Sequence, residues 1–157
     1  QPKFQKLVYS LQRTQQLVGN LSAQFNLQGQ YSTDRLSSGE TVSFGGPSIG
    51  RGYDPSLISG ERGLGLSGEL RYALSESVGN LITGIQLYGF GDYGRATALA
   101  TETSPKTTQS ISSLGVGTRM MVLGKVSLDL QLAQAQRTVG DAPRNNAQFN
   151  LNAMVVF

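Results

Sequence analysis

Long stretches of this sequence alternate strictly between apolar and polar residues. Near the C-terminal end, for example, Phe149, Leu151 and Val155 alternate with Asn150 and Asn152. Because successive side chains of a β-strand point to opposite faces, such a stretch forms a strand with one apolar and one polar face. The alternation predicts seven strands, over about residues 4–14, 18–32, 63–74, 80–93, 112–123, 125–137 and 146–157. No stretch of useful length has the spacing of an amphipathic helix, so the predicted fold class is all-β.

The expected strands and loops have the proportions of a membrane barrel. Most expected strands hold about 10–14 residues, whereas strands of soluble proteins usually hold about 5–6 and a tilted strand crosses a bilayer with about 9–11. Short turns are expected at 15–19, 75–79 and 123–125, and long loops rich in Gly, Ser, Thr and Pro at 33–62, 94–111 and 138–145. Outer-membrane barrels alternate short periplasmic turns with long external loops in this way. The sequence therefore predicts an antiparallel transmembrane β-barrel whose long loops face the cell exterior.

Seven strands do not close a barrel of this kind. Single-chain bacterial barrels have an even number of strands, about eight in the smallest, and an open sheet edge has no hydrogen-bond partner in lipid. The chain also opens with Gln1, Pro2 and Lys3, without the apolar segment of a signal peptide. Residues 1–157 are therefore predicted to be the C-terminal part of one larger barrel domain.

Composition excludes several kinds of function. The sequence contains no His and no Cys, so it has neither a Ser–His–Asp nor a Cys–His catalytic arrangement, and it lacks the usual ligands of a zinc site. Its longest apolar run, residues 153–157, is far shorter than the about 20 residues of a spanning helix. A net charge of +3 is a weak signal for nucleic-acid binding. We therefore expect no enzymatic activity, no cofactor, no metal and no nucleic-acid partner.

The most informative motif lies in the expected loop 33–62. This loop contains Arg51, Gly52 and Tyr53 among several glycines. Three further stretches follow, and the chain ends in Phe157: Glu69-Leu70-Arg71-Tyr72, Phe90-Gly91-Asp92-Tyr93-Gly94 and Ser112-Ser113-Leu114-Gly115-Val116-Gly117. In this order and spacing, the set resembles the C-terminal barrel of the two-partner-secretion transporters, the haemolysin-activator and haemagglutinin-secretion family.

The resemblance implies a fold, a location and a function. It implies a barrel of about sixteen strands in the outer membrane of a Gram-negative bacterium, with the loop that carries Arg51 folded back into the lumen. The implied function is export of an unfolded, secreted partner protein, which periplasmic domains upstream of this chain recognise. Barrel-assembly machinery and outer-membrane lipid are further implied partners. Two alternatives remain open: an assembly or insertion subunit of the same superfamily, and a passive porin.

Charge and strand parity suggest partners for Arg51. A guanidinium group buried in a lumen must meet a carboxylate. By parity, Asp92 and Phe90 face the lumen, with Gly94 just beyond them, and Asp92 is expected near the external end of its strand. Glu69 faces the lumen from the neighbouring strand. We therefore predict that Arg51 pairs with Asp92, with Glu69 as the weaker alternative partner; the other interpretation is that Arg51 is a solvated loop residue and Asp92 only ends a strand.

Four charged residues of the predicted lumen admit two interpretations. Glu69, Arg71, Arg119 and Asp129 are spaced either as an ion-pair network or as a catalytic carboxylate pair with basic neighbours. Because the sequence lacks His and any cleft motif, the ion-pair network is the favoured interpretation.

The last expected strand also has two interpretations. Its outward side chains, Phe149, Leu151, Val155 and Phe157, are either plain lipid contacts or the signal by which the assembly machinery recognises the barrel. The resemblance implies the second.

Overall fold

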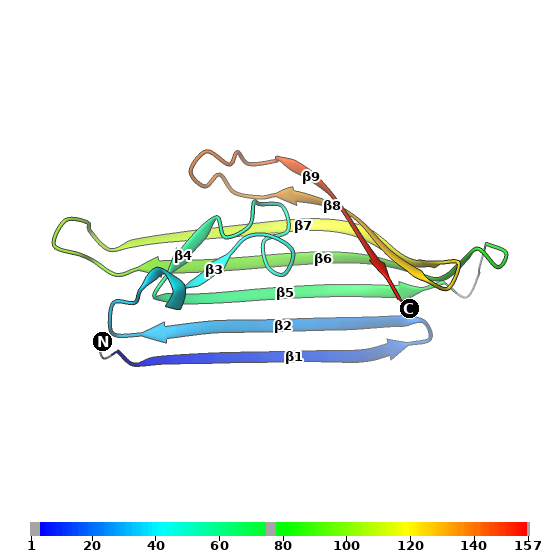
Figure 1. The fold of residues 1–157 in the computed structure, drawn as a ribbon, viewed down its shortest axis with the longest axis horizontal. Coiled ribbons are helices and arrows are strands. Elements are labelled where there is room, and N and C mark those ends of the chain that lie inside the picture. Colours follow the sequence, from blue (N-terminus) through cyan, green and yellow to red (C-terminus); the bar gives the residue numbers. More distant parts are fainter. Residues whose placement is uncertain (1–3, 75–77, 157) are drawn as a thin grey trace.

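The protein forms a long antiparallel sheet with a second, small sheet resting on it. The structure is a computed structural model that describes residues 4–74 and 78–156. Seven long strands lie side by side (Figure 1): β1 (Lys6–Val18), β2 (Leu21–Ser32), β5 (Arg62–Ala73), β6 (Ile82–Ala98), β7 (Thr107–Val122), β8 (Val126–Ala135) and β9 (Ala147–Val155). The prediction of an all-β, antiparallel fold is confirmed.

Several predicted strand ends are wrong. The predicted loop at 94–111 is shorter, because β6 continues to Ala98 and β7 begins at Thr107. The sequence is polar here, yet Thr97 pairs with Thr108 and Arg95 with Ser110 in a continuous ladder. At the other end, β1 extends to Val18, so the predicted turn at 15–19 shrinks to residues 19–20. Threonine and serine sustain strand pairing outside the apolar band, where alternation no longer reveals the strand.

The predicted loop 33–62 contains structure that the sequence did not reveal. A short 3₁₀ helix, η1 (Ser38–Glu40), precedes two three-residue strands, β3 (Val42–Phe44) and β4 (Ile58–Gly60), which form the second sheet. Residue 62 already belongs to β5. The tip of the loop, residues 45–57 with Arg51, is therefore joined to the long sheet through a two-stranded stem formed by β3 and β4.

The seven-stranded sheet has one apolar and one polar face. Large apolar side chains such as Phe25, Leu70 and Val116 are exposed on the outer face, whereas the opposite, inner face is rich in Gln, Asn, Ser and charged residues. Residues 33–61 lie against the inner face (Figure 1). The core lies between loop and sheet and consists of Phe44, Ile49, Tyr53, Ile58, Ala96, Ile111, Ala135 and Val139.

Glycines on the inner face make room for the loop. A Cβ atom added to Gly94 would lie 2.9 Å from the Cβ of Phe44, and one added to Gly63 would lie 2.9 Å from the Cε2 of the same ring. A Cβ atom added to Gly65 would lie closer still to this ring and 2.6 Å from the Cδ1 of Ile49. The side chain of Phe44 therefore docks on backbone, and larger residues at these positions would push the stem of the loop off the sheet.

The sheet is open. Within the described residues, β1 pairs only with β2 and β9 pairs only with β8. The connections at 33–61, 99–106 and 136–146 lie at one end of the long strands, here called the loop end, and those at 19–20, 74–81 and 123–125 lie at the other, the turn end (Figure 1). The predicted short turn at 75–79 lies partly outside the described residues, and the connection that contains it is as long as the one at 99–106.

Among the described residues, no helix is both long enough and apolar enough to span a membrane.

Candidate functional site

Arg51 lies at the tip of the loop and is buried against the inner face. Its side chain is only 5% exposed. Its Nη2 lies 2.8 Å from Oδ1 of Asp92 and its Nε donates to Oδ2 of the same carboxylate at 3.0 Å. Its Nη1 donates to Oε2 of Glu69 at 2.9 Å, and Nη2 also reaches the hydroxyl of Ser67 at 3.1 Å. Arg51 thus contacts its predicted partner, Asp92, and at the same time Glu69, which the sequence had suggested only as an alternative to it.

Asp92 holds the backbone of the loop as well as the arginine. Besides the bidentate contact with Arg51, its Oδ2 accepts the N–H groups of Gly50 and Arg51 at 3.2 and 3.1 Å and the hydroxyl of Ser113 at 3.3 Å. Gly50 has φ of 91°, a conformation that favours glycine and that turns consecutive N–H groups toward one carboxylate. Asp92 therefore fixes the conformation of the tip in addition to its position.

Asp92 lies deeper in the sheet than the sequence suggested. The expectation that it sits near the external end of its strand is wrong, because β6 continues six residues further, to Ala98. At about 3.3 Å per residue, Arg51 inserts about 20 Å from the loop end of β6. The loop is long enough for this depth because β3 and β4 carry the chain in and out as an extended hairpin.

Glu69 connects Arg51 to a wider network on the strands. Its Oε1 also receives Nε of Arg71 at 2.6 Å and Nη1 of Arg119 at 2.5 Å. Arg119 in turn contacts Asp129 on β8 at 3.1 Å. Of the two interpretations of these four residues, the geometry matches the ion-pair network, since both carboxylates are occupied by guanidinium groups.

The surroundings keep Arg51 charged. Burial alone would lower the pKa of its guanidinium, but the hydrogen bonds and negative charge of Asp92, followed by those of Glu69, raise the pKa above that of a free arginine. The ring of Phe90 lies under the guanidinium, 3.5 Å from its Cζ, and adds a cation–π contact. The inner face of the sheet therefore holds the charged Arg51 side chain through ion pairs, through hydrogen bonds to its planar guanidinium group and through stacking on Phe90.

Gly52 and Tyr53 hold the tip against β8. A Cβ atom on Gly52 would lie 2.7 Å from the backbone nitrogen of Ala135, so only glycine fits there. Tyr53 is 2% exposed. Its hydroxyl donates to the carbonyl of Arg137 (2.9 Å) or Ser112 (3.1 Å) and accepts the N–H of Arg137 at 3.0 Å.

Removal of that hydroxyl tests the role of Tyr53 as an anchor. We expect Tyr53→Phe to destabilise the docked loop by about 1–3 kcal/mol, because buried polar groups lose their partner. Limited proteolysis of the loop in the full-length protein should therefore be faster in this variant. Tyr93→Phe is a matched control, since the Tyr93 hydroxyl has no hydrogen bond among those of the described residues; equal cleavage of the two variants would contradict the anchoring role.

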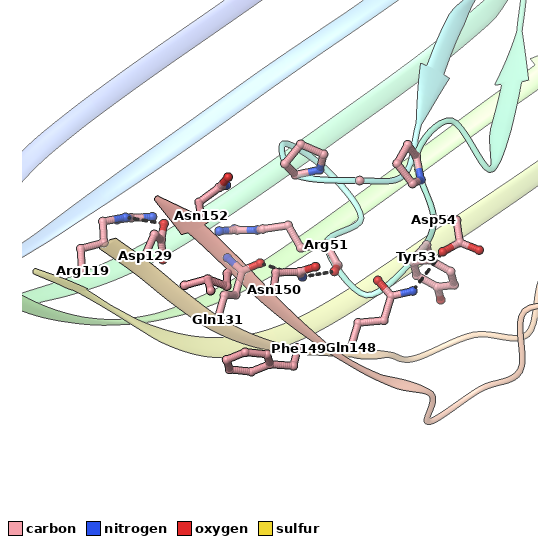
Figure 2. A pocket seen from close by; sticks show the side chains of 14 residues that line it. Arg51, Tyr53, Asp54, Arg119, Asp129, Gln131, Gln148, Phe149, Asn150 and Asn152 are labelled. Atoms are coloured by element: carbon pink, nitrogen blue, oxygen red, sulfur yellow. Dashed lines mark hydrogen bonds and ion pairs between the residues drawn. The ribbon is translucent and has the colours of Figure 1, made fainter. Parts of the chain in front are cut away.

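A polar cavity of about 690 Å³ separates the loop tip from β8 and β9. Figure 2 shows the inner side chains of these strands facing the loop across it. Asn150 donates to the carbonyl of Arg51 at 3.4 Å, and Gln148 donates to Asp54 at 3.3 Å. Amides and charged groups dominate the lining, so the cavity is suited to water or to polar chain segments.

The predicted assembly signal lies on the outer face of an edge strand. Phe149, Leu151 and Val155 are 68%, 60% and 54% exposed on β9. Phe157 lies outside the described residues. The arrangement presents an apolar row beside an unpaired strand edge, and its role in assembly stays a prediction.

Some site residues could not be found from the sequence. Ser67 and Ser113 contact Arg51 and Asp92 from neighbouring strands, but serines are common on the inner face. The strand register places both serines in the site, because Ser67 on β5 and Ser113 on β7 each lie directly opposite Asp92 on β6. Register is the signal that would have identified them.

Comparison with known proteins identifies the family. The family model described as haemolysin secretion/activation protein ShlB/FhaC/HecB matches residues 1–120. The match spans β1 to β6, the loop with Arg51 and most of β7. The chain therefore belongs to this family of two-partner-secretion transporters, which confirms the resemblance. No curated protein and no solved structure matches the chain significantly.

Proposed function

We propose that this chain is part of an outer-membrane barrel that exports a secreted partner protein in unfolded form, with the loop at 33–61 acting as a lid inside the lumen. The observation that carries the proposal is the buried Arg51, held by Asp92 and Glu69 on the polar face of a sheet whose other face is apolar. A loop that reaches about 20 Å along the inner wall occupies space through which a polypeptide would pass. Such a lid suits a regulated conduit better than a permanently open porin.

The two faces of the sheet support placement in a membrane. The exposed outer residues, such as Leu11, Leu87 and Leu132, would cost free energy in water and match lipid. Because an open edge in lipid leaves backbone groups unsatisfied, we infer that further strands outside residues 1–157 close the barrel. Family membership suggests a Gram-negative outer membrane and a total of about sixteen strands.

The proposal also assigns partners. The family implies a secreted exoprotein as cargo, and we infer recognition of this cargo by periplasmic domains, insertion by barrel-assembly machinery and contact with outer-membrane lipid. The proposed activity is transport without catalysis, cofactor or nucleic acid. An assembly or insertion subunit remains the alternative; it would leave secretion unchanged when deleted and would lower the amounts of other barrel proteins.

Topology provides the first test. In the full-length protein, single cysteines at Ser38, Thr101 and Asp141, all exposed in the loops, should react in intact cells with a thiol reagent that does not cross the outer membrane. A cysteine at Lys125, exposed in a hairpin turn at the opposite end, is the matched control and should react only after permeabilisation. The reverse pattern, or labelling of all four only in permeabilised cells, would overturn the proposed placement.

A further inference from the structure

Three arginines gather on the outer face of the sheet at the loop end of the strands. Arg95 on β6 is exposed and lies directly opposite Ser110 on β7. The guanidinium of Arg137, just after β8, donates to the hydroxyl of the same Ser110 at 3.1 Å. Arg62 on β5 lies opposite Thr97, diagonal to Arg95, a spacing of about 7–8 Å between such neighbours. We call Arg62, Arg95 and Arg137 the outer arginine cluster.

The cluster lacks counter-charges within the protein. On the inner face, Arg51, Arg71 and Arg119 are matched by Glu69, Asp92 and Asp129. Among the residues that the structure describes, none of the outer three forms an ion pair. Like charges on neighbouring strands repel one another, most strongly where they are directly opposite, so an anion bound from outside the protein would stabilise this part of the outer face.

Tyrosines mark the depth at which this cluster lies. The ring of Tyr31 is 4.5 Å from the guanidinium carbon of Arg62, and the ring of Tyr93 is 6.0 Å from that of Arg137. Tyrosine on the lipid face of a barrel is typical of the boundary between hydrocarbon and headgroups. The cluster is therefore at headgroup level on the side of the long loops.

We propose that the outer arginine cluster binds the phosphate groups of an anionic glycolipid in the outer leaflet, the chemistry of lipid A. The inference rests on the proposed function, since that proposal turns the long loops toward the cell surface. Arginine is suited to this ligand because its planar fork donates two parallel hydrogen bonds to phosphate oxygens. Headgroup phosphates would neutralise three adjacent cations while the acyl chains cover Leu64 and Leu66 below.

The test measures lipid binding to the purified full-length transporter in detergent. The readout is the temperature at which the folded, heat-modifiable barrel is lost, titrated with bisphosphorylated lipid A. The variant R95Q/R137Q should raise the apparent dissociation constant at least tenfold. The matched control R13Q/K125Q removes the same charge from two exposed residues that lie away from the loop end, Arg13 within β1 and Lys125 in a hairpin turn, and should stay within twofold of the unmodified protein.

Two further arms identify the source of the phosphate. Dephosphorylated lipid A should give no stabilisation, and inorganic phosphate at the same concentration should give none either. Equal weakening in R95Q/R137Q and R13Q/K125Q would overturn the inference, as would stabilisation by inorganic phosphate alone. The cysteine at Thr101 separates this failure from that of the proposed function: surface labelling without lipid binding contradicts only the lipid site, whereas absence of surface labelling contradicts the proposed topology whatever binds in detergent.

Discussion

Replacement of Arg51 by alanine is expected to lower secretion of the cargo at least tenfold while lowering the amount of folded barrel much less. The change leaves Asp92, which is 4% exposed, without its bidentate partner, and stranding one member of a buried ion pair costs about 3–5 kcal/mol. The loop bears this cost, because Glu69 keeps Arg71 and Arg119. The measurement is cargo in the culture medium relative to barrel in the outer membrane, in the full-length protein.

Two companion variants sharpen this result. Arg51→Lys should fail nearly as badly, because an ammonium group cannot reproduce a fork that spans Asp92 and Glu69. Arg35→Ala is the control within the same loop: this arginine is half-exposed and its Nη2 lies 3.7 Å from Oε1 of the buried Glu61. Because Glu61 keeps the N–H of Leu99 as a partner at 2.8 Å, we expect a smaller loss of secretion than in Arg51→Ala. Secretion unchanged in Arg51→Lys would show that charge alone suffices.

A double-mutant cycle tests the contact itself. Because Arg51→Ala and Asp92→Ala each abolish the same interaction, the double variant should be little worse than Asp92→Ala alone. The backbone N–H groups of Gly50 and Arg51 also bind Asp92, so Asp92→Ala should be the more damaging single change. Strict additivity of the two losses would mean that the residues do not act through their contact.

Gly52→Ala is expected to cause a loss of secretion comparable with Arg51→Ala, although it changes no charge. The added Cβ atom would lie 2.7 Å from the backbone nitrogen of Ala135 and 2.8 Å from the carbonyl carbon of Gln134. Both atoms belong to the backbone of the β8 region and cannot shift without breaking strand pairing. The tip of the loop must therefore move away from β8, and this movement exposes the loop to protease added outside intact cells.

Gly39→Ala is the matched control for this substitution. Gly39 lies in the same loop, within η1, and an added Cβ atom would meet nothing within 4 Å. Its secretion and protease resistance should match those of the unmodified protein. A Gly52→Ala variant that secretes normally with a protected loop would show that the tip tolerates a shift from β8.

The sequence predicted the strands and the main ion pair for one physical reason. Period-two alternation reports both the strand and the face of each side chain, so the shared face of Asp92 and Phe90 followed directly. Arg51 could be assigned to that face only because a cation in a polar lumen needs a carboxylate. The hairpin of β3 and β4 was not predicted, because strands of three residues are too short to show a period-two alternation.

Contacts that depend on strand register or on loop conformation could not be predicted from the sequence. The contact between Arg119 and Glu69 can be predicted only from the register of three strands. In that register, Phe90 on β6 lies opposite Glu69 on β5 and opposite Gly115 on β7, the strand that carries Arg119. The need for glycine at position 52 arises from a close approach to β8, more than eighty residues later. Strand ends were misplaced where Thr and Ser replaced apolar residues, because alternation reports only the apolar part of the outer face, and the strands continue beyond it.

Departure of the loop changes the balance of charge on the inner face of the sheet. With the loop docked, three arginines balance three carboxylates: Arg51, Arg71 and Arg119 against Glu69, Asp92 and Asp129. When the loop leaves, it removes one of the positive charges, and Asp92 retains only the Ser113 hydroxyl. At this level of the proposed conduit, the three carboxylates of the wall then face two arginines, and this local excess of negative charge favours passage of potassium over chloride. An opened pore should therefore differ from a closed one in ion selectivity, measurable as a shift of reversal potential under a salt gradient.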